Sequence, residues 1–310
     1  MSPIYSIAFY NLENLFDPMD NEVTLDKDYT PEGIFKWDKD KYEQKIEKLS
    51  KVMSKIGTMR SEVPPLLIGV CEVENETCLN DLIHSKHLKD HGYGYVFHRS
   101  PDTRGIHVGL LYRKDCFEVS GMQGHSLELN KEGDPEFSRD ILCVKGWLFG
   151  REIHVLLNHW PSRTDGTMKT NYKRKSASRL IRDIISDITA GSPGASLLVM
   201  GDFNEDPMGK YIRQLGTLDL INPMEQFQVQ KKGSVKYKGK WMMFDQIMFN
   251  KNLRDSEWWH FLEAHIFVEP YLVQKSGRYK GSPKRTYIGK YHQGGYSDHF
   301  PVFIYFEKSD

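Results

Sequence analysis

The chain has 310 residues, of which 39% are hydrophobic and 12% aromatic, enough to bury a large core. Its 42 basic and 42 acidic residues balance, which excludes a highly charged disordered chain and a protein that coats nucleic acid through a general basic excess. Any contact with nucleic acid must therefore come from a local concentration of basic residues.

In the first half of the chain, apolar runs typical of buried strands alternate with amphipathic helical patterns. A helix is expected after Asp38, a suitable N-cap, because apolar residues from Tyr42 to Ile56 recur at steps of three and four. A shorter helical pattern follows Glu76. The predicted strands are Ile4–Tyr10, Leu66–Val73, Ile106–Arg113 and Ile141–Phe149.

The second half continues in the same way. A long helix is expected from about Lys173 to Thr189, with an apolar stripe that ends before Gly191, and a shorter helical pattern follows Pro207. The predicted strands are Glu152–Trp160, Ser196–Gly201, Phe244–Phe249 and Pro301–Phe306.

Strands outnumber helices, and the helices are too widely spaced for a regular βαβ alternation. This pattern favours an α+β layered sandwich over a doubly wound parallel sheet. No linker composition divides the sequence and no repeat is visible. We therefore expect one domain over residues 1–310, and a monomer.

Three further observations bear on location and redox state. The four cysteines lack metal-ligand or redox spacing, so we expect free thiols. The apolar runs are too short to span a membrane. Residues 1–10 are typical of a strand and not of a signal peptide, so we expect a cytoplasmic protein.

Acidic and amide residues repeatedly stand at the ends of apolar runs. One such residue would be an ordinary turn or cap signal, but several together indicate strand ends that converge on one charged site. Clustered carboxylates are costly unless a cation neutralises them, and oxygen ligands suit Mg²⁺ or Mn²⁺ better than zinc. The residues concerned are Asn11, Glu72, Asp202, Asn204, Asp245 and Asp298.

The pair Asp202 and Asn204 is two residues apart on a strand end, so both side chains can face one ligand. The carboxylate can deprotonate water and the amide can donate to a developing oxyanion. The alternative is a turn with Asn204 as a helix N-cap. Asp245 can orient the imidazole of His299 toward phosphate. His159 follows an apolar run, where a structural histidine is the alternative.

These motifs, in this order, resemble the endonuclease/exonuclease/phosphatase superfamily, which includes deoxyribonuclease I, exonuclease III, neutral sphingomyelinases and inositol polyphosphate phosphatases. The resemblance extends from residue 11 to residue 299 and is greatest to bacterial members with Asn-His-Trp-Pro-Ser. The segments that carry it are Asn11–Asn14, Glu72, Asn158–Ser162, Gly201–Asn204, Asp245 and Gly295–His299.

The resemblance implies a four-layer α/β/β/α sandwich of the deoxyribonuclease I type, and it implies roles for the site residues. Glu72 would ligate Mg²⁺, with Asn11 and Asp298 close to the metal. Asp202 would activate the water and Asn204 would stabilise the transition state. His159 and His299, the latter oriented by Asp245, would hold the scissile phosphate. Glu13 sits where some relatives have Asp or Asn.

Two arginines and two basic segments remain. Arg104 and Arg139 are candidate substrate-binding residues, with a structural ion pair as the alternative for each. Lys231–Lys240 is expected to be a basic loop. The segment Lys275–Lys290 carries basic residues and tyrosines without an acidic residue, so it is either a solvated loop or a rim for an anionic substrate.

The sequence thus predicts a divalent-metal-dependent hydrolase of phosphate esters, with nucleic acid as the first substrate class. One alternative is a phospholipid or small-metabolite phosphoesterase on the same fold. The aromatic run Trp258–Phe261 is a candidate membrane-facing element, with a buried strand as the competing interpretation. Another alternative is a binding module without catalysis, which should have lost an essential group.

Overall fold

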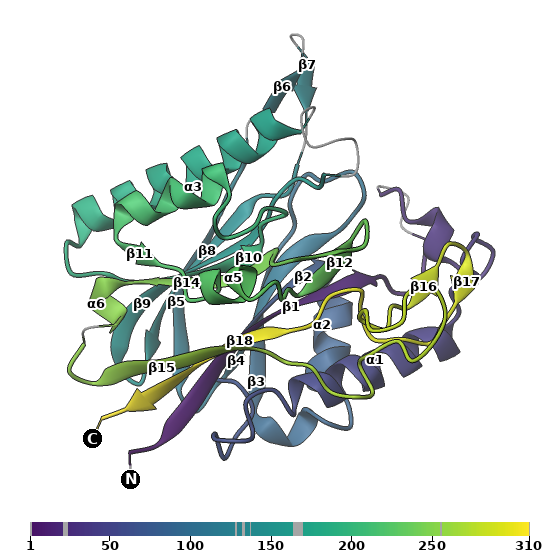
Figure 1. Ribbon diagram of the computed structural model, residues 1–310, viewed down its shortest axis with the longest axis horizontal. Coiled ribbons are helices and arrows are strands. Elements are labelled where there is room, and N and C mark those ends of the chain that lie inside the picture. The colour runs from purple at the N-terminus through teal and green to yellow at the C-terminus, as the bar shows by residue number, and fades with distance from the viewer. Residues whose placement is uncertain are drawn as a thin grey trace.

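Two six-stranded β-sheets face each other at the centre of the protein, and helices cover their outer faces (Figure 1). The computed structural model describes residues 2–20, 24–127, 129–131, 134–136, 138–163, 170–254 and 256–309. The resulting helix, sheet, sheet and helix layers are those of the expected α+β sandwich of the deoxyribonuclease I type.

The first sheet is antiparallel except for one parallel pair near its middle, β1 and β2. Parallel partners place their carboxyl ends at the same edge of a sheet, so residues that follow both strands come together. In spatial order the strands are β15 (Trp259–Ile266), β18 (Val302–Lys308), β1 (Ile4–Leu15), β2 (Leu67–Val73), β4 (His107–Arg113) and β3 (Tyr93–His98).

The second sheet repeats this arrangement, because β9 and β10 form a parallel pair among antiparallel neighbours. The carboxyl ends of both parallel pairs carry the polar residues that the sequence singled out. In spatial order the strands are β11 (Leu220–Ile221), β14 (Asp245–Asn250), β10 (Ser196–Asp202), β9 (Arg151–His159), β8 (Ile141–Leu148) and β5 (Phe117–His125).

Helices α1 (Lys39–Met53) and α2 (Glu76–Ile83) pack on the first sheet, and α3 (Asn171–Gly191) packs on the second (Figure 1). Asp38 caps α1 as expected, since its side chain accepts a hydrogen bond from the Lys41 N–H. The other helices are short: α4 (Lys210–Arg213), α5 (Glu225–Val229), α6 (Lys251–Arg254), η1 (Lys27–Tyr29), η2 (Lys89–His91) and η3 (Leu215–Leu218).

Small hairpins complete the described elements. The basic segment that was expected to be a loop instead forms the hairpin β12–β13, and the segment after residue 286 forms β16–β17. The hairpins are β6 (Leu129–Lys131) with β7 (Asp134–Glu136), β12 (Val235–Tyr237) with β13 (Lys240–Met242), and β16 (Tyr287–Ile288) with β17 (Tyr291–His292).

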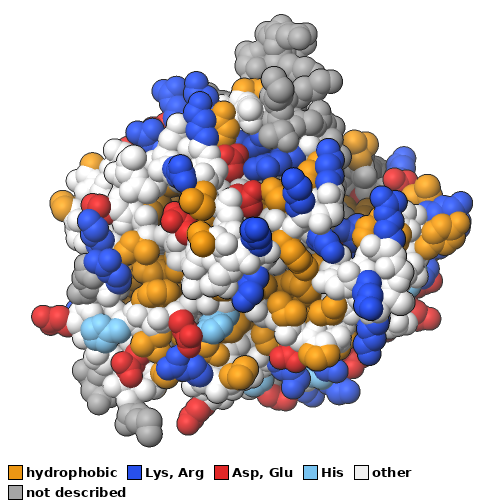
Figure 2. Space-filling view, in the orientation of Figure 1, with side chains coloured by type: hydrophobic (Ala, Val, Ile, Leu, Met, Phe, Trp, Pro, Cys, Tyr) orange, Lys and Arg blue, Asp and Glu red, His pale blue; other side chains and the backbone are white. Residues whose placement is uncertain are grey.

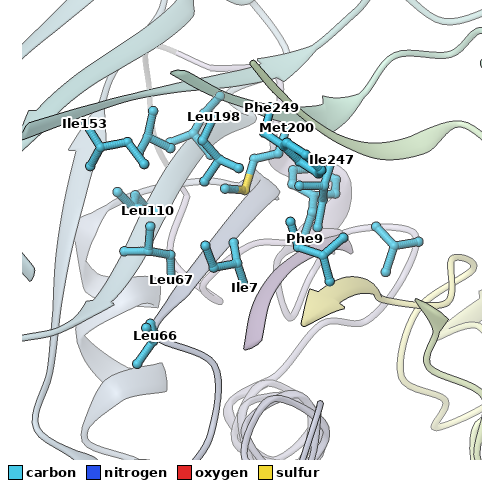
Figure 3. Close-up of a cluster of buried hydrophobic side chains, with 14 of the residues drawn as sticks. Ile7, Phe9, Leu66, Leu67, Leu110, Ile153, Leu198, Met200, Ile247 and Phe249 are labelled. Atoms are coloured by element: carbon cyan, nitrogen blue, oxygen red, sulfur yellow. The ribbon is translucent and has the colours of Figure 1, made fainter. Parts of the chain in front are cut away.

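The largest core lies between the two sheets, where Ile7, Phe9 and Leu67 face Leu198 and Met200 across the interface (Figure 3). The sheets approach so closely at Gly69 that an added Cβ would lie 2.4 Å from the Met200 sulfur. Both faces of β1 are buried, because Ile7 and Phe9 face the other sheet while Ala8 and Tyr10 face α1 and α2. This explains its continuous apolar sequence.

Every predicted strand is found, with ends displaced by a few residues, and the predicted helices are confirmed. In the two large sheets the sequence did not predict β3, β5 and β11, and it offered β15 only as the buried-strand alternative for Trp258–Phe261. Strand β5 lacks an apolar run because this edge strand is mostly exposed. All four cysteines lie in the described ranges and are buried free thiols. Among the described residues, no helix is long and apolar enough to cross a membrane.

Candidate active site

One row of side chains crosses the second sheet at its polar edge. Asp202 ends β10 and is in register with His159 at the end of β9 and with Asp245 at the start of β14. Partners in register project from the same face of a sheet, so these three side chains lie side by side. The His159 Nε2 atom is 3.8 Å from Asp202 Oδ2.

Asn11 and Glu72 reach the same place from the first sheet. The Asn11 amide donates to Glu72 Oε1 at 3.3 Å and to Asp202 Oδ2 at 3.1 Å, so it connects the two sheets. Glu72 Oε1 also lies 3.8 Å from His159 Nε2. The predicted convergence of distant strand ends is therefore present in the structure.

The backbone is left-handed at two of these residues, which is uncommon outside glycine. Glu72 has φ of 61° and Asn204 has φ of 47°. The Glu72 carboxylate is held by the backbone N–H of Asn14 at 2.9 Å. Asn204 donates from its backbone N–H to Asp202 Oδ1 and from its amide to the Trp160 carbonyl oxygen. No described helix begins at Asn204, so the N-cap alternative was wrong.

His299 and Asp298 enter from the segment that precedes β18. His299 Nδ1 lies 2.6 Å from Asp245 Oδ2, and its Nε2 lies 3.9 Å from both Asp202 Oδ2 and Asp298 Oδ1. Ser297 fixes this segment, because its hydroxyl donates to the Asn11 carbonyl and accepts from the His299 N–H. One ring nitrogen therefore contacts a buried carboxylate, and the other faces Asp202 and Asp298.

Burial and mutual repulsion make the carboxylates hard to ionise. Burial raises the pKa of Asp202 to about 7, although the charge on His299 opposes the shift. The pKa of Glu72 is also raised, first by burial and then by Asp298. Such a group of acids is stabilised when a cation lies among them.

The two imidazoles differ in charge. Burial alone would lower the pKa of His299, but the Asp245 carboxylate overcomes this and holds it well above its usual value. The pKa of His159 is well below its usual value because of burial and the nearby Arg104 and His299 charges. At neutral pH the site thus contains one imidazolium and one neutral imidazole.

The acidic and histidine groups can hold a divalent cation. Glu72 and Asp298 supply carboxylate oxygens, which hard cations prefer. Asn11 lies beside Glu72, with its amide nitrogen toward the site and its oxygen bonded to the Glu13 N–H. The side chains of Glu72 and Asp298 keep 18% and 29% of their exposure, so the donors are open to solvent. Three other groups of described residues bring ligand atoms within 4.8 Å of one another: Asp202, Asp245 and His299; Cys71, His159 and Asp202; and Asp17, Glu74 and Cys78.

The two candidate arginines share one partner but differ in exposure. The buried Arg139 pairs with Asp102 at 3.2 Å and donates to the carbonyl oxygens of His159 and Trp160. This arrangement favours the ion-pair alternative for Arg139. Its guanidinium fixes the backbone of His159 and does not face the site as a free cation. Arg104 pairs with Asp102 at 3.3 Å, but its side chain is 53% exposed and remains available to an anion.

Sequence reasoning missed a buried lysine beside the site. Lys45 on α1 donates to the Tyr296 carbonyl at 2.6 Å and to the Thr286 hydroxyl, and lies 3.8 Å from the Glu13 carboxylate. Glu13 in turn accepts from the Thr286 N–H. The signal was present, because Lys45 lies three residues after Tyr42 within the buried stripe of α1.

Comparisons with known proteins agree with this fold. A sequence profile described as the Endonuclease/Exonuclease/phosphatase family matches residues 6–308. No match was found among curated proteins. Solved structures with the same fold were found, at sequence identities too low to carry a function across.

Three examples of these structures each have a TM-score of 0.60. An endonuclease/exonuclease/phosphatase family protein from Bacteroides thetaiotaomicron is 14% identical, with 100% of this chain and 99% of that chain covered. The human Nocturnin catalytic domain with bound sulfate is 14% identical, with coverage of 100% and 96%. The mannosyl-6-phosphatase of B. thetaiotaomicron VPI-5482 is 17% identical, with coverage of 97% and 98%.

Proposed function

Because the chain belongs to the endonuclease/exonuclease/phosphatase family, we propose that it is a divalent-metal-dependent phosphoesterase that uses water to cut phosphodiesters, with nucleic acid as the first substrate class. One observation carries the proposal. The ends of both parallel strand pairs bring Asn11, Glu72, His159 and Asp202 together, and the Asp245–His299 pair lies beside them.

Glu72 and Asp298 would hold Mg²⁺, or Mn²⁺ in its place, through carboxylate oxygens, with Asn11 close to the metal. When bound, the cation would offset the negative charge on the phosphate oxygens and on the carboxylates around it. The raised pKa of Glu72 supports this assignment, because burial and Asp298 both penalise its charge when nothing compensates it.

Asp202 would orient the attacking water and accept its proton. Its Oδ1 is held by the Asn204 N–H at 2.9 Å and its Oδ2 by the Asn11 amide at 3.1 Å, so the carboxylate has one fixed orientation. Asn204 uses one amide hydrogen on the Trp160 carbonyl, which leaves the second for a phosphate oxygen in the transition state.

The histidines would hold the scissile phosphate. The His299 imidazolium would donate from Nε2 to a phosphate oxygen, because Asp245 occupies Nδ1 and stabilises the positive charge. His159 would donate as a neutral ring from the other side. Positive charge and hydrogen bonds at the phosphate are most of what this reaction requires.

The basic hairpin β12–β13 and the basic segment Lys275–Lys290 beside the site support a polyanionic substrate. Val235 of β12 forms a β-bridge with His299, and Arg285 Nη2 lies 3.4 Å from Asp298 Oδ2. In Figure 2, lysine and arginine side chains are frequent over the half of the face that contains β12–β13 and β16–β17. Trp241 and Tyr279 lie among these cations and could stack on bases.

A membrane substrate is less well supported. Trp259 is fully buried and stacks on Phe306, as the buried-strand interpretation of the aromatic run required. It is also in register with Lys308, at the end of β18 that lies away from His299. The run therefore gives the site no apolar element that would face a lipid.

The test is hydrolysis of bis-p-nitrophenyl phosphate and of the mono-ester, each with Mg²⁺ and with EDTA. We expect diester cleavage that EDTA abolishes and that Asp202→Ala reduces by at least about 10²-fold. Asp183→Ala, which removes an exposed carboxylate on α3, is the matched control and should keep full activity.

The remaining outcomes separate the alternatives. Preference for the mono-ester would favour a small phosphorylated metabolite, and no cleavage of either ester would favour a binding module. Activity that survives in Asp202→Ala would contradict the role of that residue. The natural substrate class is then identified with plasmid DNA, single-stranded DNA, RNA and sphingomyelin. Cleavage of sphingomyelin alone would contradict the proposal that nucleic acid is the substrate.

A further inference from the structure

A thiol that the proposed hydrolysis does not use lies at the floor of the site. Cys71 is fully buried and belongs to the core between the two sheets. It is in register with Asn11 on the neighbouring strand, so both side chains project from the same face of the first sheet. Asn11 bonds to Asp202 across the interface, and Cys71 therefore faces the same opposing row.

That row completes a set of three different donors. The Cys71 sulfur, a ring nitrogen of His159 and a carboxylate oxygen of Asp202 all lie within 4.8 Å of one another. His159 and Asp202 are partners in register on β9 and β10, so the second sheet presents both to the thiol. The set is formed by the strand register and does not depend on a loop.

The imidazole in this set lacks the hydrogen bonds that a buried ring normally makes. His159 is 5% exposed, and its Nδ1 atom has no hydrogen-bond partner in the described part of the protein. Its Nε2 atom lies 3.8 Å from both Glu72 and Asp202, beyond hydrogen-bond distance. A buried ring nitrogen without a hydrogen-bond partner indicates a ligand that the protein alone does not supply.

We propose that Cys71, His159 and Asp202 form a binding site for a thiophilic divalent cation, Zn²⁺ or Cd²⁺. Sulfur, imidazole nitrogen and carboxylate oxygen are the ligands of zinc sites, whereas Mg²⁺ avoids sulfur. When the metal binds, it replaces the proton on the Cys71 sulfur, and this proton is released to solvent. Three protein ligands leave a fourth position for water.

This site is distinct from the proposed Mg²⁺ site at Asn11, Glu72 and Asp298, but it uses two residues of the proposed reaction. A cation held there withdraws Asp202 from water and His159 from phosphate. We therefore expect Zn²⁺ to inhibit hydrolysis even when Mg²⁺ is saturating. Inhibition rests on the proposed function, whereas binding does not.

Binding is tested by titrating the full-length protein with Cd²⁺ in excess Mg²⁺ and following the ultraviolet charge-transfer absorption of the thiolate–cadmium bond. The wild type should develop the absorption with one equivalent, and Zn²⁺ should abolish it by competition. Cys71→Ser should lose the absorption. Cys116→Ser is the matched control, because Cys116 is also a buried free thiol, and it should keep the absorption.

A second variant keeps the test valid even if Cys71→Ser does not fold. His159→Gln retains the thiol and should weaken Cd²⁺ binding by at least about tenfold. Absence of the absorption in the wild type, or its persistence at full strength in Cys71→Ser, overturns the proposal. So does unchanged affinity in His159→Gln.

The inhibition arm uses bis-p-nitrophenyl phosphate in saturating Mg²⁺. Cys71→Ser should require at least about tenfold more Zn²⁺ for half inhibition than the wild type and Cys116→Ser. Equal sensitivity of the three proteins contradicts the proposal. Cadmium absorption that depends on Cys71 in a protein without phosphoesterase activity would support the metal site and contradict the proposed function alone.

Discussion

The Nδ1 atom of His299 lies 2.6 Å from Oδ2 of Asp245, whose side chain is fully buried. The second Asp245 oxygen has no hydrogen-bond partner among the described side chains and backbone groups. The imidazolium is therefore the main compensation for a buried carboxylate, and the carboxylate in turn fixes the ring with Nε2 facing Asp202 and Asp298. Each member of the pair depends on the other for its charge.

Asp245→Asn should lower kcat for the diester by about 10²–10⁴-fold, because the amide keeps the size of the carboxylate but loses its charge. The measurement is steady-state hydrolysis in Mg²⁺. Asp219→Asn, which removes an exposed partner of Lys251, is the control and should be unchanged. Activity within twofold of wild type in Asp245→Asn would show that the pair is only structural.

Asn204→Asp should lower kcat by about 10²–10³-fold, the usual effect of losing a donor to a transition-state oxyanion. Aspartate tolerates the left-handed backbone at φ of 47°, so the fold should survive while the donor becomes an acceptor. Thermal unfolding checks the fold and steady-state kinetics check the donor. A variant with normal stability and normal kcat would contradict the role of the amide.

Mg²⁺ should raise the melting temperature of the wild type, because a ligand that binds only the folded state stabilises it by about 2.7 kcal/mol at 100 times its Kd. Glu72→Gln should lose most of this effect, since the amide cannot supply the charge. Glu43→Gln, an exposed change on α1, is the matched control. An identical Mg²⁺ effect in Glu72→Gln would remove Glu72 from the metal site.

Lys45→Met should reduce the free energy of unfolding by about 3–5 kcal/mol, because it leaves the partly buried Glu13 without its cation. The double variant Lys45→Met with Glu13→Gln should recover part of the loss. Urea unfolding measures both. Lys39→Met is the control, since its pair with Glu43 is exposed and should contribute less than about 1 kcal/mol.

His107 should make the fold sensitive to acid. Burial lowers its pKa from 6.5 to about 4, and the ring accepts the Ser100 N–H at Nδ1. The unfolded chain thus binds the proton more readily than the folded one. Stability should be complete above pH 6.5 and fall as the pH drops toward 4, by at most about 3 kcal/mol.

The pH dependence of urea unfolding measures this effect. His107→Gln should flatten it between pH 6.5 and 4, whereas His260→Gln, at an exposed position, should leave it unchanged. If the free energy of unfolding of His107→Gln falls with pH as steeply as that of the wild type, another group causes the acid sensitivity.

The strands and their polar ends could be predicted from sequence because both faces of the central strands are buried, and this produces continuous apolar runs. The pairing order could not. That Asp202 lies between His159 and Asp245, and that Cys71 faces them, follows from the register of strands far apart in the chain. A lone cysteine in an apolar run resembles any small core residue. The expectation of one domain over residues 1–310 stays a prediction.

Arg139 and Lys45 show a second limit of sequence reasoning. The sequence does not show which group a basic side chain contacts, so Arg139 was equally consistent with binding phosphate and with forming a structural ion pair. The structure distinguishes these because all of its observed contacts are to Asp102 and to backbone carbonyls. For Lys45, the apolar stripe of α1 was visible but the acceptors of its ammonium group lie on distant segments.

The position of β18 has a consequence for biosynthesis. This strand is inserted between β15 and β1, and the segment before it carries Asp298 and His299. A nascent chain on the ribosome therefore holds most of both sheets before it can close the first one or complete its set of catalytic groups. Contacts between residues this far apart in sequence form slowly. The catalytic groups should thus come together only after β18 has been synthesised and has paired with β1 and β15.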